Sequence, residues 1–126
     1  MKPARSDALD RTTELAQAAL VALSRYERVL RGAGQWGSPM RLTALLRLGE
    51  RIDIRREHAA ATQALLALEE ALAAADLPPA GVALTPLPPG ERAHRQAAEA
   101  KTRIKHLMNK LQQARQMRGQ EETDAL

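Results

Sequence analysis

Residues 76–90 read DLPPAGVALTPLPPG and contain five of the seven prolines in the chain. Proline lacks a backbone N–H and moves the residue before it out of the α region, so this stretch cannot form a helix. It is instead a semi-stiff, extended connector, and its 15 residues are enough to span the length of a helical bundle. The connector therefore allows a last helix to start back at the far end of the bundle.

The sequence on either side of the connector repeats its apolar residues with the period of a helix. One amphipathic pattern covers residues 7–31 and is followed by two glycines that end it. Ser38 and Pro39 are typical of an N-cap and a first helical position, and they start a second pattern over residues 39–75. A third pattern covers residues 91–118. We therefore expect three helices.

These patterns predict an all-α fold: an antiparallel three-helix bundle with a long Pro-rich connector before the third helix. The bundle forms a single domain over residues 1–126, in which the third helix packs beside the second. Residues 119–126 are an acidic tail that we expect to be mobile. Hydrophobic residues make up 44% of the chain and are mostly Ala and Leu, with no Phe. This composition favours narrow packing between helices and a thin core.

The second predicted helix carries two apolar stripes on nearly opposite sides. The first stripe consists of Leu42, Leu45, Leu46, Gly49 and Ile52, and the second of Leu65, Leu68 and Leu72, with Ile54 and Ala61. No Pro or Gly in residues 50–75 forces a kink, so we expect a continuous helix whose second stripe binds another chain, either a second copy or a subunit of an assembly. Trp36, in the loop before this helix, either plugs the end of the bundle, or stacks on a base or anchors a partner.

The third predicted helix concentrates positive charge. Between residues 91 and 118 there are eight basic residues and two acids, in a chain whose net charge is +4. Arg and Lys side chains that neutralise successive phosphates give affinity without regard to base sequence. The predicted contacts with a nucleic-acid backbone are Arg92, Arg95, Lys101, Arg103, Lys105, Lys110, Arg115 and Arg118. The alternatives are a solvated basic face and a surface for an acidic protein.

Residue patterns for catalysis and metal binding are missing from the sequence. The chain has no Cys and its three His residues are dispersed, so no nucleophile has a base beside it. Glu91 and His94 form a single Glu-x-x-His, whereas a carboxylate-bridged metal site in a bundle needs two. We therefore expect no enzyme activity, no metal site and no cofactor. The lack of Cys, of a recognisable signal peptide and of a membrane-spanning run favours the cytoplasm.

In size, helicity and basicity the chain resembles the small non-catalytic helical subunits of ribonucleoprotein effector complexes, CRISPR surveillance complexes among them. In its order of long helix, Trp-containing turn and long helix it resembles flagellar and type III export chaperones. Charge decides between the two, because a chaperone that works through an apolar groove does not need a basic helix. We expect an accessory subunit that contacts a DNA or RNA backbone within a larger complex. The alternative is a cytoplasmic helical adaptor or export chaperone that binds a partner helix.

Overall fold

The computed structural model describes residues 5–34, 43–87 and 90–124, with side chains for residues 7–31, 52–87 and 90–117. Within these residues it contains no strand and three helices: α1 (Arg5–Gly34), α2 (Thr43–Ala74) and α3 (Glu91–Asp124). The all-α three-helix bundle expected from the sequence is therefore confirmed. Trp36 and the predicted cap at Ser38 and Pro39 lie outside the described residues. None of the described helices has an apolar stretch long enough to cross a membrane.

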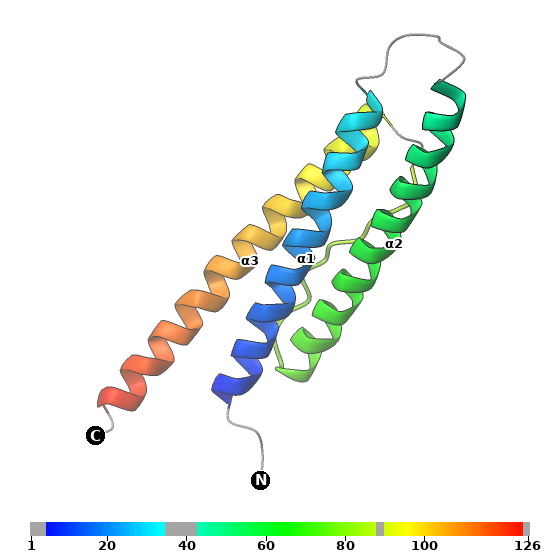
Figure 1. Ribbon diagram of the computed structural model, residues 1–126. Coiled ribbons are helices and arrows are strands. Elements are labelled where there is room, and N and C mark those ends of the chain that lie inside the picture. The colour runs from blue at the N-terminus through cyan, green and yellow to red at the C-terminus, as the bar shows by residue number, and fades with distance from the viewer. Residues whose placement is uncertain (1–4, 35–42, 88–89, 125–126) are drawn as a thin grey trace.

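Helix α1 lies between the other two helices and packs against both (Figure 1). It runs in one direction, whereas α2 and α3 both run in the opposite direction. Among the described residues, no Cα atom of α2 comes within 8 Å of a Cα atom of α3. The third helix therefore packs on α1, and the expectation that it packs beside the second helix is wrong.

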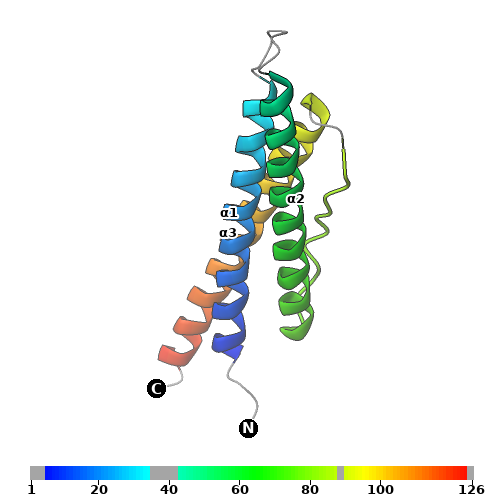
Figure 2. The same cartoon turned by 45° about the vertical axis from the view of Figure 1, so that its right-hand side comes forward.

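The connector separates α2 from α3 because it lies along both of them. Figure 2 shows it running beside α2 back to the end at which α3 begins. The Glu69 carboxylate of α2 accepts a hydrogen bond from the Ala80 backbone N–H at 2.9 Å. Leu84 is buried in the core, and Leu77 and Val82 pack against it. The apolar side chains of the connector thus occupy the place that a direct contact between α2 and α3 would take.

The core follows the seven-residue repeat of a coiled coil, in which buried positions alternate at spacings of three and four. In α1 these positions are Leu9, Thr12, Ala16, Ala19, Leu23, Tyr26 and Leu30. In the other helices the buried residues are Ile54, Ala61, Leu65, Leu68 and Leu72 (α2) and Ala93, Ala97, Ala100, Ile104 and Leu111 (α3). Thr12 fits this row because its hydroxyl donates a hydrogen bond to the Ala8 carbonyl at 2.7 Å. The buried alanines allow the helices to approach closely.

The second stripe of α2 faces its own bundle. Leu65, Leu68 and Leu72 are 4%, 0% and 0% exposed, respectively. They belong to the core that α2 shares with α1, so the expectation that they bind another chain is corrected. The physical reason is the heptad spacing, which continues unbroken from Ile54 to Leu72 and keeps this row towards α1. Ile52, from the first stripe, is 57% exposed.

The C-terminus of α2 ends in a Schellman motif. The Leu77 N–H donates to the Leu72 carbonyl at 2.9 Å, and the Asp76 N–H donates to the Ala73 carbonyl at 3.2 Å. Asp76 adopts the left-handed conformation that this motif requires, with φ of 57°. Leu77 packs back onto the core, as the motif favours. The chain is thereby turned out of the helix and into the connector.

Helix α3 continues beyond its predicted end. The sequence places that end before Gly119 and a mobile acidic tail after it, whereas the helix runs to Asp124. Glycine costs only about 1 kcal/mol relative to Ala inside a helix, and Gln and Glu after it are good helix formers. Gly119 therefore does not terminate the helix here.

Candidate nucleic-acid interface

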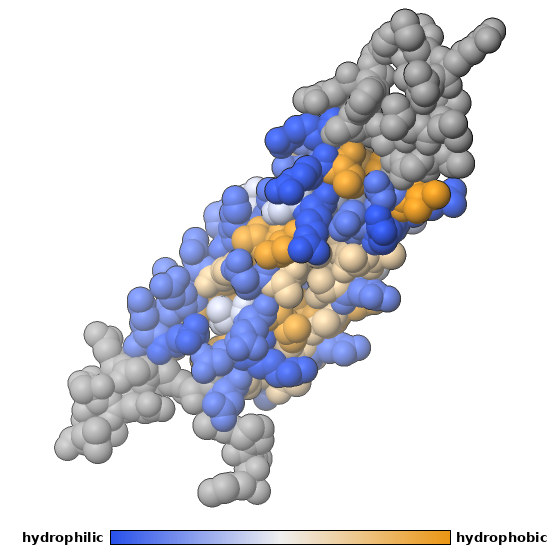
Figure 3. All heavy atoms as spheres, viewed as in Figure 1, coloured by the Kyte–Doolittle hydropathy of each residue, from blue (hydrophilic) through white to orange (hydrophobic). Residues whose placement is uncertain are grey.

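The basic side chains of α3 are spread around the helix, and some of them lie beside α1 or the connector. Arg92, Arg95, Arg103, Lys105, Lys110 and Arg115 are exposed, and Lys101 is half-buried. The side chain of Arg118 lies outside the described residues. In Figure 3 hydrophilic residues cover the side of the molecule formed by α3, and apolar residues gather over α1 and α2. The structure therefore divides the predicted contacts among three environments.

The first environment is the flank of α3 that meets α1. Lys101 Nζ lies 3.6 Å from Glu27 Oε1, and Arg115 Nη2 lies 2.7 Å from Asp10 Oδ1. Both carboxylates come from α1, so these two cations serve the packing of α3 on α1. A part of the charge predicted to meet phosphate is therefore neutralised within the bundle.

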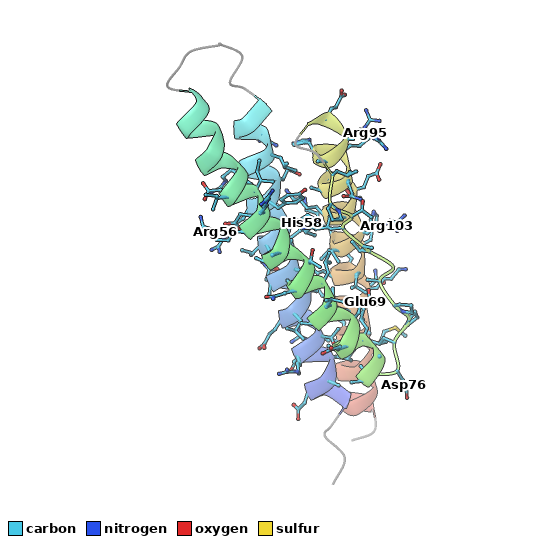
Figure 4. All side chains as sticks on the ribbon, turned by 90° about the vertical axis from the view of Figure 1, so that its right-hand side faces the viewer. Arg56, His58, Glu69, Asp76, Arg95 and Arg103 are labelled. Carbon is cyan, nitrogen blue, oxygen red and sulfur yellow. The ribbon has the colours of Figure 1, made fainter. Side chains whose placement is uncertain are left out.

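The second environment is the flank of α3 that meets the connector. Arg103 Nη1 donates a hydrogen bond to the Gly81 carbonyl at 3.1 Å, and Gln96 Nε2 donates to Thr85 Oγ1 at 2.7 Å. Figure 4 shows Arg103 beside the connector and Glu69 on α2. A carbonyl oxygen does not neutralise a guanidinium, so Arg103 keeps its full positive charge at the surface.

The third environment is the outer surface of α3. Arg95 pairs with Glu91 at 3.4 Å, but both side chains are exposed and such pairs contribute little free energy. Arg92, Lys105 and Lys110 are exposed and have no ion-pair partner among the described residues. These three cations are therefore available to a ligand without breaking any contact that the structure describes.

Helix α1 carries basic residues at and beside Glu27 that are not among the eight predicted contacts. Arg31 Nη2 lies 3.0 Å from Glu27 Oε1, the same oxygen that Lys101 approaches from α3. Arg28 precedes Arg31 by one helical turn and is exposed. The pairing of Glu27 with Arg31 can be read from their spacing of four residues, but the position of Lys101 beside them depends on tertiary packing.

Tyr26 of α1 and His58 of α2 form an edge-to-face aromatic pair in the bundle interior. Their ring centroids are 5.2 Å apart and their planes are inclined by 77°. Burial raises the pKa of Tyr26 above its ordinary value of 10.0, because the phenolate is less well solvated inside the core. The arrangement indicates a packing role for both rings.

Acidic and His side chains are the residues of this chain that could hold a metal ion. No group of three or more such side chains comes together in the described part of the chain. Glu91, one half of the Glu-x-x-His pattern, pairs with Arg95. Asp53, on the charged face of α2, pairs with Arg56. Both carboxylates are thus engaged by neighbouring guanidinium groups.

No protein-family model, curated protein or solved structure matches this chain.

Proposed function

We propose that this protein is a non-catalytic, cytoplasmic accessory subunit that contacts a nucleic-acid backbone through the outer surface of α3 within a larger complex. The supporting observation is the charge that α3 retains after the bundle has formed its ion pairs. Seven basic residues and two acids lie between residues 91 and 117. Among the described residues, only Lys101 and Arg115 of these seven pair with carboxylates of another helix. The remaining cations face solvent, where phosphates can reach them.

The length of α3 suits contact with an extended polyanion. From Arg92 to Lys110 the helix rises by about 27 Å, at about 1.5 Å per residue. Arg92 and Lys110 are about five turns apart and therefore lie on the same face, and the exposed Arg95 and Arg103 border that face, so exposed cations recur along this length. A phosphate backbone that follows the helix axis meets several of them at once, and each contact releases a counterion.

The chemistry of α3 favours contact with the backbone over contact with bases. The helix contains no aromatic residue, and stacking of unpaired bases requires an aromatic or Arg platform that is held in place. Tyr26 is buried in the core and presents no ring to solvent. We therefore expect similar affinities for oligonucleotides of different sequence.

The alternative function, an adaptor or export chaperone for a partner helix, has less support. It depends on an accessible row at Leu65, Leu68 and Leu72, and these side chains lie in the core. Among the described residues, the large exposed apolar side chains are Val21, Ile52, Leu66 and Met117, which lie on three different helices. They do not form a row on one helix face.

A charge-removal experiment tests the proposal. The variant R92Q/K105Q/K110Q removes three unpaired cations from α3 and keeps good helix formers, so folding should be unaffected. Its binding to a short fluorescein-labelled oligonucleotide is measured by anisotropy between about 50 and 200 mM salt. The log-log salt slope should shrink by about 2 to 3, since each lost contact contributes about 0.7 to 0.9.

The matched control is R11Q/R25Q/R55Q, which removes three exposed cations from α1 and α2. Its net charge equals that of the α3 variant, so any effect of overall charge is the same in both. The control should bind with nearly the wild-type slope. Equal losses in the two triple variants would contradict a specific role for α3, as would wild-type binding by the α3 variant.

A further inference from the structure

We propose that the junction of α1 and α3 holds one phosphate of the bound strand between Arg31 and Lys101, and that Glu27 occupies this place in the unbound protein. The inference rests on the proposed function and extends it to a second helix. It identifies α1 as part of the interface and Glu27 as a built-in competitor of the nucleic acid.

The geometry around Glu27 is that of an anion held by two cations. Its Oε1 lies 3.0 Å from Arg31 Nη2 on its own helix and 3.6 Å from Lys101 Nζ on α3. The side chain of Glu27 is 12% exposed, whereas that of Arg31 is 61% exposed. One carboxylate thus pairs with two cations, so this cluster of three side chains keeps a net charge of +1. Both cations point towards the place that Glu27 Oε1 occupies.

Two more cations flank this pair, and we call the four residues Arg28, Arg31, Lys101 and Lys105 the basic edge. Arg28 and Arg31 are three residues apart on α1, and Lys101 and Lys105 are four apart on α3, so each pair shares one helix face. Arg28 and Lys105 are exposed. A strand that already contacts Lys105 therefore has a path to the site at Glu27.

Other acids do not neutralise the basic edge. On α1 the preceding acid, Glu14, is about three and a half turns away from Glu27. On α3 the acid nearest to Lys101 in sequence is Glu99. It shares a helix face with Gln96 and Arg103, which are three and four residues away from it. These two residues contact the connector, so Glu99 lies on that flank of α3. Glu27 is thus the one carboxylate among the described side chains that neutralises the basic edge.

A phosphodiester offers the two cations the same chemistry as the carboxylate. Both groups carry one negative charge and have two free oxygens that can accept from Arg31 and Lys101. Arg31 is exposed enough to turn towards an incoming phosphate. The Glu27 carboxylate then repels the strand, so its charge lowers the affinity of the wild-type protein.

The pair of Asp10 and Arg115 provides a comparison on the same two helices. Asp10 Oδ1 contacts Arg115 Nη2 at 2.7 Å, and no second cation contacts Asp10 among the described residues. Asp10→Asn and Glu27→Gln both remove one negative charge from a carboxylate that pairs α1 with α3. The two substitutions differ in the number of cations that lose their carboxylate partner. Glu27→Gln leaves two cations, Arg31 and Lys101, and Asp10→Asn leaves one, Arg115.

The experiment compares Glu27→Gln and Asp10→Asn in binding to the same labelled oligonucleotide, single-stranded and duplex. Glu27→Gln should bind about threefold tighter at low salt, because the phosphate no longer has to displace a carboxylate, while the log-log slope should stay close to that of wild type since the number of phosphate contacts is the same. Asp10→Asn should bind like wild type. Equal changes in the two variants, or weaker binding by Glu27→Gln, would overturn the inference.

A second variant keeps the inference testable if Glu27→Gln is poorly folded, which thermal unfolding reveals. Lys101→Gln leaves the pair of Glu27 and Arg31 in place, and it should reduce the slope by about 0.7 to 0.9. Arg25→Gln is its control, since Arg25 is exposed on α1 outside the basic edge.

A wild-type protein that binds no oligonucleotide would refute the proposed function itself. Binding that depends on Arg92 and Lys110 but not on Lys101 or Glu27 would refute this inference alone.

Discussion

Lys101 of α3 and Glu27 of α1 form an ion pair across the helix junction, with Nζ 3.6 Å from Oε1. Arg115 and Asp10 repeat this contact further along the same two helices. The residue numbers rise along α3 while they fall along α1, as expected for helices that run in opposite directions. The basic helix is thus held in register by carboxylates of α1, and its remaining cations are directed away from the bundle.

Replacement of Asp76, the left-handed residue at the end of α2, by glycine should stabilise the fold. Asp76 has φ of 57°, a conformation that costs an L-residue about 1 kcal/mol and glycine nothing. Asp76→Gly should therefore raise the free energy of unfolding by up to about 1 kcal/mol, measured by urea denaturation. Gly81→Ala should lower the free energy of unfolding. No atom lies near the added Cβ, but Gly81 has φ of 69°, a conformation that is unfavourable for alanine. A loss of stability in Asp76→Gly would mean that the Asp76 side chain itself stabilises the turn.

The leucine row of α2 should behave as core. Leu68 is fully buried, so Leu68→Ala should lower the free energy of unfolding by about 2 to 5 kcal/mol, through lost burial and the cavity left behind. Leu66, two residues earlier on the same helix, is 60% exposed, and Leu66→Ala should change stability by less than about 0.5 kcal/mol. Similar unfolding midpoints for the two variants would contradict the heptad assignment of α2.

The buried Tyr26 should make the bundle sensitive to high pH. Its pKa is raised in the folded state by burial, so above pH 10 the unfolded chain loses the Tyr26 proton while the folded chain still holds it. The unfolded state then binds fewer protons, and stability falls as pH increases. The stabilising contribution is complete below the unfolded pKa and is lost as the pH rises through the folded pKa.

Tyr26→Phe has no proton to lose and should show a smaller loss of stability between pH 9 and 11 than wild type. Unfolding in urea at the two pH values measures the difference. An identical alkaline loss in wild type and Tyr26→Phe would assign the effect to other groups, such as the Lys side chains.

The sequence predicts the local features of this fold well. Prolines mark the connector, and periodicity predicts the three helices. Helices α1 and α3 extend beyond their predicted ends because Gly34 and Gly119 are tolerated inside helices. The sequence predicts the wrong partner for Leu65, Leu68 and Leu72, because the second helix carries two apolar stripes and their spacing does not say which one packs on the first helix. An apolar stripe shows that a face is buried but not which chain buries it.

The candidate interface is predictable only in part for the same reason. The charge of α3 is a property of its composition and is visible in the sequence. The engagement of Lys101, Arg103 and Arg115 depends on how α1 and the connector lie against α3, which involves residues far apart in the chain. Spacing along the chain does not predict these contacts, so the sequence alone predicts a phosphate contact for all eight cations alike.

Chemical footprinting of the lysines reports directly whether α3 contacts the nucleic acid. The chain has four lysines, Lys2 near its start and Lys101, Lys105 and Lys110 on α3. Each can be modified with an amine-reactive reagent and quantified by mass spectrometry, with and without saturating duplex. We expect the duplex to protect Lys105 and Lys110, added salt to remove this protection, and Lys2 to be modified equally in both samples. Unchanged modification of Lys105 and Lys110 in a sample that binds the duplex would contradict the assignment of α3 as the nucleic-acid interface.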